Sequence, residues 1–202
     1  MRLRKPPQKK NNRSIATGGR ENGLPHPLLK KGTKRMNTLN KFIIFKSREE
    51  EYGIHIQSVI SIERAQKVNP IPKLPEFVRG VMRVRDELVP IIDVEHVFYQ
   101  TQLVHEEDAR IIVLQTQALP IGLLVKEAND IVEILENDQK QIGLVGYDRT
   151  KYFTGVANLG GRLITVVDAD LFTESLEGIK EIAAYMKEAK AAAKSQNTGV
   201  GG

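Results

Sequence analysis

Cysteine is absent from the 202 residues, and no long apolar run is present. Without cysteine the chain can form no disulfide, no thiolate metal site and no cysteine nucleophile. No apolar stretch approaches the ~18 residues that a transmembrane helix needs, and the N-terminus lacks the apolar core of a secretory signal. We therefore expect a cytoplasmic protein.

Acidic residues are almost missing from the first 41 positions, where Glu21 stands alone beside 12 of the 30 Lys and Arg. This segment carries +11, whereas the remaining residues have 18 basic and 24 acidic groups and carry −6. Residues 1–38 are rich in Pro, Gly, Asn and Lys and show no apolar periodicity, so they cannot bury enough surface to offset their ordering entropy. We expect a disordered basic tail at 1–38 and a folded domain at 39–202. Met36 is a candidate for the biological start.

The folded body is predicted to be mainly β, because short β-type runs alternate with turn residues and helical periodicity is weak before residue 170. Ten such runs are predicted as strands: 42–45, 52–56, 59–64, 80–84, 88–92, 110–115, 121–126, 131–135, 153–158 and 162–167.

The two sets of five strands look like an internal repeat. The run from Gly80 to Asp93 aligns with the run from Gly155 to Asp168 at an offset of 75, and residues 42–54 align with 111–123 at an offset of 69. Two copies are too few for a solenoid, whereas five short strands close readily into a small barrel. We expect one five-stranded barrel at about 41–100, a second at about 108–170, and an amphipathic C-terminal helix at about 170–194.

Residues suited to catalysis or metal binding are not grouped in this sequence. No two histidines have the i, i+4 spacing of a helical zinc site. Asp93 and Asp168 each follow an apolar strand and precede a short helix, which indicates helix caps rather than a catalytic pair. Asn158-Leu159-Gly160-Gly161 fits a hairpin turn and lacks the Lys and Ser/Thr of a phosphate-binding loop. We expect no enzyme activity, no cofactor and no metal.

One set of runs extends over nearly all of residues 41–175: Tyr52-Gly53-Ile54, Val59–Ile62, Pro75–Val81, Arg85, Val89–Asp93, Tyr152–Gly155, Leu159-Gly160 and Leu163-Ile164. Together these runs resemble the CheW domain, the chemotaxis coupling family. The resemblance implies two SH3-like barrels. It also implies an adaptor at the inner face of the membrane that binds the CheW-like regulatory domain of the chemotaxis histidine kinase and the cytoplasmic hairpin tip of chemoreceptors.

The same resemblance implies a partner-binding surface made of Arg85, Val59, Ile62, Gly80 and Val84. The family's Asn-Leu-Arg-Gly pattern reads here as Arg83, Val84, Arg85 and Asp86, so the arginine is kept and the turn glycine is not. Ser61 stands at a position of this cluster where the family has an acidic residue. Strand alternation requires some of the aliphatic side chains to be core instead of contact residues.

The alternative is a nucleic-acid-binding protein that combines small β-barrels with the basic tail. Nucleic-acid binding would weaken steeply with salt and need the tail. Binding to kinase and receptor would survive deletion of residues 1–38.

Overall fold

The computed structural model describes residues 40–85, 87–104, 108–135, 138–141 and 150–197. By its internal contacts the chain divides into two units, Met1–Arg35 and Met36–Gly202, and every described residue lies in the second. The expected tail at 1–38 and the question of Met36 as the start fall outside the described residues.

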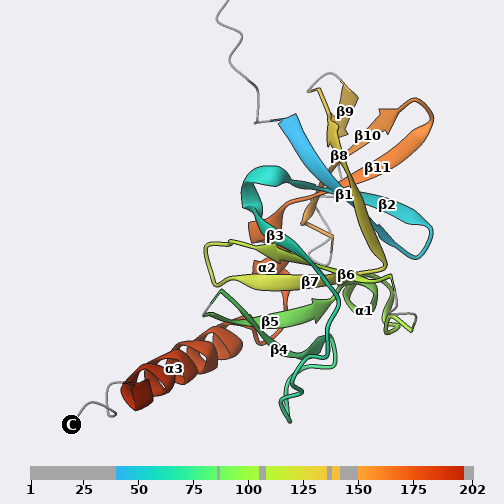
Figure 1. Cartoon of the computed structure of the whole chain (residues 1–202). Coiled ribbons are helices and arrows are strands. Elements are labelled where there is room, and N and C mark those ends of the chain that lie inside the picture. Colours follow the sequence, from blue (N-terminus) through green and yellow to red (C-terminus); the bar gives the residue numbers. More distant parts are fainter. Residues whose placement is uncertain (1–39, 86, 105–107, 136–137, 142–149, 198–202) are drawn as a thin grey trace, which may run out of the picture. The chain divides into compact units, whose positions relative to one another are not determined.

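The first sheet has six strands in the order β8-β1-β2-β11-β10-β9 (Figure 1). Strand β11 runs parallel to β2, and the other neighbours are antiparallel. The strands are β1 (Lys41–Ser47), β2 (Glu50–His55), β8 (Glu127–Glu133), β9 (Gln139–Gln141), β10 (Phe153–Leu159) and β11 (Arg162–Val167).

The second sheet has five strands in the order β3-β6-β7-β5-β4. Its parallel pair is β5 and β7. Asn69 and Val81 exchange two backbone hydrogen bonds of 3.0 and 2.9 Å, so the segment after β3 pairs with β4, the strand at the opposite edge. The strands are β3 (Val59–Arg64), β4 (Val78–Val84), β5 (Glu87–Asp93), β6 (Arg110–Leu114) and β7 (Ile121–Val125).

The ten strand runs and the mainly β fold class are confirmed, with one addition. The short polar strand β9 was not expected, and β8 begins at Glu127 instead of 131. Each sheet also contains strands from both sides of the expected boundary between residues 100 and 108. Hairpin β1–β2 joins hairpin β10–β11, and hairpin β6–β7 joins hairpin β4–β5, each through a parallel pair. Each sheet therefore combines one hairpin from each repeat, and neither 41–100 nor 108–170 coincides with a sheet.

Three α-helices and a short 3₁₀ helix complete the described part. Asp93 caps α1 by accepting a hydrogen bond from the His96 amide at 3.1 Å, and Asp168 caps α2 by accepting one from the Leu171 amide at 2.9 Å, which confirms both expected caps. The helices are η2 (Ile56–Ser58), α1 (Val94–Tyr99), α2 (Ala169–Ser175) and α3 (Ile179–Asn197).

The expected single C-terminal helix is instead two helices. The backbone becomes extended at Leu176, the C-cap of α2. Gly178 then has a left-handed φ of 74° before α3 begins. A helix cannot continue through a residue in that conformation, and glycine enters it without steric cost.

The core has a shared cluster and one interior cluster for each sheet. Alternation along β1 shows the division: Phe42 and Ile44 lie in the interior of the six-stranded sheet, while Ile43 and Phe45 belong to the shared cluster. The shared cluster also contains residues from the five-stranded sheet and fully buried Phe172 of α2. Burial of each such large side chain stabilises the fold by about 1.5–3 kcal/mol.

Candidate partner-binding surface

The turn between β4 and β5 presents Arg85 to solvent. Arg85 has a left-handed φ of 48°, a conformation that costs a non-glycine residue about 1–2 kcal/mol. Neither Arg85 nor the exposed Arg83 makes an ion pair with any described residue. Asp86, which stands where the family has its turn glycine, lies outside the described residues. The turn therefore holds two guanidinium groups available for a partner's carboxylates.

Strand β3 is an edge strand that carries both aliphatic candidates, Val59 and Ile62, and the two differ in burial. Ile62 is 40% exposed, whereas Val59 is half-buried and packs against the shared core cluster. A shift in the register between Val59 and Ser61 changes the alternation along the strand. Ile62 is thus the apolar side chain that β3 offers to a partner.

Gly80 and Val84 lie on β4 but are buried. Gly80 has a φ of 144°, and a Cβ added there would meet the Asn69 carbonyl. These two residues would affect a partner only by positioning β4 and its turn.

All five candidate residues belong to the five-stranded sheet. Val59 and Ile62 lie on edge strand β3, and the other three lie on edge strand β4 or in the turn that follows it. The bridge between Asn69 and Val81 connects the chain after β3 to β4. What the arrangement offers outward is an aliphatic edge and a basic turn, a combination suited to protein binding.

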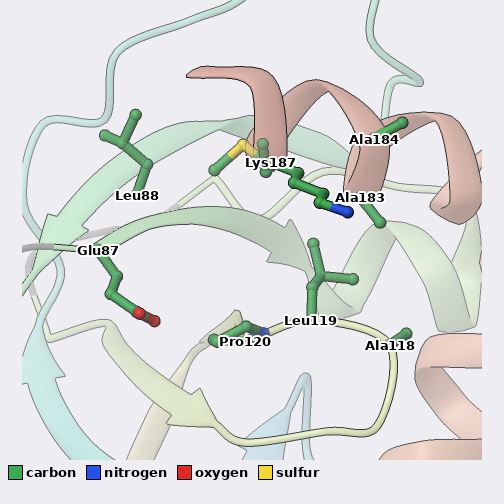
Figure 2. Close-up of a pocket in the computed structure, with 9 residues that line it drawn as sticks. Glu87, Leu88, Ala118, Leu119, Pro120, Ala183, Ala184 and Lys187 are labelled. Atoms are coloured by element: carbon green, nitrogen blue, oxygen red, sulfur yellow. The ribbon is translucent and has the colours of Figure 1, made fainter. Parts of the chain in front are cut away.

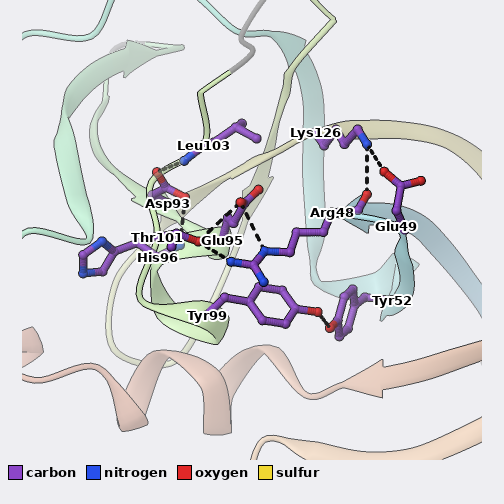
Figure 3. Close-up of polar contacts among 10 residues, drawn as sticks. All are labelled: Arg48, Glu49, Tyr52, Asp93, Glu95, His96, Tyr99, Thr101, Leu103 and Lys126. Carbon is purple, nitrogen blue, oxygen red and sulfur yellow. Dashed lines mark hydrogen bonds and ion pairs between the residues drawn. The ribbon is translucent and has the colours of Figure 1, made fainter.

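A polar network missed in the sequence joins the β1–β2 turn to α1 and the residues after it (Figure 3). The Arg48 guanidinium lies 4.2 Å from the centre of the Tyr99 ring and donates a 2.6 Å hydrogen bond to the Thr101 hydroxyl. Arg48 also pairs with Glu95 at 3.4 Å, and the Tyr52 and Tyr99 hydroxyls are 2.5 Å apart. Burial and the hydrogen bond to Tyr99 raise the pKa of Tyr52 well above its ordinary value. The network links the two sheets, since β1 and β2 belong to one and α1 follows β5 of the other.

An ion cluster ties three strands of the six-stranded sheet together. Arg162 on β11 donates two hydrogen bonds to the Glu51 carboxylate on β2, at 2.9 and 2.8 Å, and pairs with Asp130 on β8 at 3.0 Å. The hydrogen bond from Arg162 lowers the pKa of Glu51, and the acidic partners raise the pKa of Arg162.

We predict that Arg162→Ala destabilises the protein by about 1 kcal/mol or less at pH 7, because the pair is partly exposed. The Glu51 pKa is lower in the folded than in the unfolded state, so this stabilisation is present above the unfolded pKa and is lost as the pH falls through the folded pKa. Urea unfolding at several pH values should show that the difference in the free energy of unfolding between wild type and variant becomes smaller at acidic pH. The matched control is Arg64→Ala, at an exposed arginine without an ion pair among the described residues; an equal, pH-independent loss in both variants would contradict this account.

Neither a membrane-spanning helix nor a metal-binding group is found in the part of the chain that the structure describes. No helix there is long and apolar enough to cross a bilayer. No three His, Asp or Glu side chains of the described residues are placed to hold a metal ion.

Comparison with known proteins identifies one family. The family model for the CheW-like domain matches residues 41–177. "Chemotaxis protein CheW" of Klebsiella aerogenes is 31% identical over 138 residues, covering 68% of this chain and 83% of that protein. The protein of the same name from Bacillus subtilis is 27% identical over 139 residues, covering 68% of this chain and 89% of its own.

A solved structure shows the same fold. The crystal structure of the scaffolding protein TtCheW from Thermoanaerobacter tengcongensis superposes with a TM-score of 0.61 at 25% identity. The match covers 69% of this chain and 90% of that one. The expected pair of SH3-like barrels is thereby confirmed, and none of these matches supports the nucleic-acid alternative.

Proposed function

Because the chain belongs to the CheW-like domain family, we propose that it is a chemotaxis adaptor that couples chemoreceptors to the chemotaxis histidine kinase by binding both and catalysing nothing. The observation that carries this proposal is the family match, which extends over 137 consecutive residues, 41–177, and includes every strand of both sheets. Its relatives are named as chemotaxis and scaffolding proteins.

The partners in this proposal are the CheW-like regulatory domain of the kinase and the cytoplasmic hairpin tip of the receptors. The adaptor would work at the inner face of the membrane, within the receptor array. Such a role needs separate surfaces for two proteins, and the exposed Ile62 on β3 and the Arg85 turn are two such places on opposite edge strands.

The chemistry of these surfaces suits an exchangeable contact. An arginine can form paired hydrogen bonds with a carboxylate, and a partly exposed isoleucine adds apolar area without exposing a large hydrophobic patch. Arg85 follows Val84, which pairs with Glu87 across the β4–β5 hairpin, so the contact would be made from a turn that the strand pairing closes.

We predict that Arg85→Glu reduces capture of the kinase regulatory domain by about tenfold or more, because it places a like charge opposite the acidic groups that Arg85 would bind. The measurement is a pull-down with purified wild type and variant at equal concentration. Lys140→Glu is the matched control, since it makes the same change of charge at an exposed position on β9, outside the candidate surface. Undiminished capture by Arg85→Glu would remove Arg85 from the contact, and no capture by the wild type would refute the proposed function.

A further inference from the structure

A polar hollow of about 420 Å³ lies where the chain before β4, helix α1 and the end of α2 meet. Pro75, Phe77 and Leu176 supply apolar walls, and most of the remaining lining is polar. Phe77 directly precedes β4, whereas Arg85 directly follows it. The hollow therefore lies at the opposite end of β4 from the Arg85 turn.

Two polar atoms at the hollow have no hydrogen-bond partner. Tyr152 is only 4% exposed, its ring packs against three other aromatic rings, and its hydroxyl makes no hydrogen bond with any described residue. The hydroxyl is not one of the fully enclosed unpartnered atoms, so the small exposed surface of Tyr152 includes it. The Nδ1 atom of His96 is enclosed and unpartnered, and its ring points away from the Arg48 network (Figure 3). A buried polar group without a partner costs free energy, which a ligand bonded to the Tyr152 hydroxyl would regain.

The hollow has carboxylates at its rim. Glu76 and Glu177 line it, both are exposed, and neither makes an ion pair with any described residue. A third carboxylate lies close by, since a Cβ added at Gly178 would be 4.0 Å from Glu181 and 3.7 Å from Pro75. No lysine or arginine is among the described residues that line the hollow. The hollow therefore attracts a positively charged group.

The arrangement of these groups favours a guanidinium ion over other cations. No three His, Asp or Glu side chains of the described part are placed to hold a metal ion. A guanidinium has several N–H donors in one plane and is more weakly hydrated than an ammonium, so it can bond to carboxylates and to a hydroxyl oxygen together. Burial raises the pKa of Tyr152 to about 12, so its hydroxyl is neutral at pH 7. Phe77 and Leu176 offer apolar surface to the methylene groups of an arginine.

The acidic rim also indicates that this arginine belongs to a protein. Free arginine carries a carboxylate that Glu76 and Glu177 would repel, whereas an arginine within a polypeptide has none. We propose that the hollow binds an arginine side chain of a partner protein, with the guanidinium donating hydrogen bonds to Glu76, Glu177 and the Tyr152 hydroxyl. This site goes beyond the proposed function and does not depend on it.

A second hollow, of about 400 Å³, provides a comparison within the same protein. It lies between the start of β5, the β6–β7 turn and α3, and apolar side chains form most of its lining (Figure 2). It carries both an acid, Glu87, and a base, Lys187. Since its own ammonium opposes a second cation, an arginine should not bind there.

The test is an NMR titration of the full chain with a short peptide that has blocked ends and a single arginine. The matching peptide with citrulline, which has nearly the same shape and no charge, is the ligand control. The arginine peptide should shift the amide signals of Glu76, Gln100 and Glu177, and the citrulline peptide should not. Glu177→Gln should weaken arginine binding about tenfold. Glu188→Gln makes the same change at an exposed position of α3 that does not line the hollow, and it should leave binding within about twofold.

Tyr152→Phe separates a role in binding from a role in stability. It removes only the hydroxyl, so it should weaken arginine binding about fivefold. The urea midpoint of the free protein should stay the same or rise, because the hydroxyl has no partner there to lose. Tyr185→Phe is the control, at an exposed tyrosine of α3 that does not line the hollow.

Three results would overturn this inference. The first is equal binding of the arginine and citrulline peptides, or of wild type and Tyr152→Phe. The second is a shift of the Leu119 and Ala183 signals instead, which would place the peptide in the second hollow. The third is free arginine binding as tightly as the peptide, which would overturn the assignment to a protein partner. Kinase and receptor are absent from this titration, so its failure would leave the proposed function standing.

Discussion

Replacing Gly80 with alanine is expected to lower the free energy of unfolding by about 3 kcal/mol, the upper part of the range for backbone strain at one residue. Gly80 has a φ of 144°, and an added Cβ would meet the Asn69 carbonyl oxygen and lie 2.8 Å from its carbon. Both obstacles are backbone atoms, so no side chain can rotate away. Relief would break the hydrogen bonds that Asn69 exchanges with Val81. Urea unfolding followed by circular dichroism measures the loss.

Gly160→Ala is the matched control for this prediction. Gly160 also has a positive φ, 59°, but an added Cβ would have nothing within 4 Å. Gly160→Ala should therefore lower the free energy of unfolding only by the backbone strain, about 1 kcal/mol. Equal losses at the two glycines would show that the close approach to Asn69 contributes nothing to stability.

Asp93→Ala is expected to lower the free energy of unfolding by about 3 kcal/mol, because it leaves buried donors without their acceptor. The Asp93 carboxylate is fully buried and accepts hydrogen bonds from the backbone amides of His96 at 3.1 Å and Leu103 at 3.0 Å (Figure 3). It also pairs with Arg79 at 3.5 Å. Loss of the carboxylate therefore releases both the start of α1 and the chain after it. Urea unfolding of the purified variant measures the effect.

Asp168→Ala tests the same position in the second repeat. Asp168 caps α2 through the Leu171 amide, and it is only half-buried. Removing a single cap costs about 1 kcal/mol. If Asp93→Ala and Asp168→Ala lower the free energy of unfolding equally, the contacts of Asp93 with the Leu103 amide and Arg79 do not stabilise the protein as we propose.

Local features of the fold could be predicted because neighbouring residues determine them. Gly160 and Gly161 have φ values of 59° and 94°, which matches the two-residue turn expected from Gly-Gly between apolar strands. Asp93 and Asp168 cap helices because a short acid after a strand can accept the free amides of the first turn. These elements need no information about distant parts of the chain.

Strand partners could not be predicted in the same way. Strands β2 and β11 are adjacent, although more than 100 residues separate Glu51 from Ile164 in the sequence. Each hairpin of the repeat has a similar apolar pattern, so the sequence does not show which hairpin pairs with which. The network around Arg48 depends on the same long-range placement, since Arg48 and Thr101 are 53 residues apart.

The candidate surface could be predicted from the sequence only in part, because it too depends on how distant segments pair. Alternation on β3 indicates that some of its aliphatic residues are buried, but the register shift after Val59 decides which ones. The burial of Gly80 follows from the bridge to Asn69, which no local pattern indicates. The place where α3 packs could not be predicted either, because the break at Gly178 sets the direction of that helix.

The most direct test of the adaptor function is a reconstitution of receptor control. Autophosphorylation of the chemotaxis histidine kinase is measured with receptor-containing membranes, in the presence and absence of this protein. The proposed function predicts that the membranes change kinase activity several-fold only when the protein is added, and that attractant reverses the change. Kinase activity that responds to the membranes equally well without the protein, or not at all with it, would contradict the proposed function.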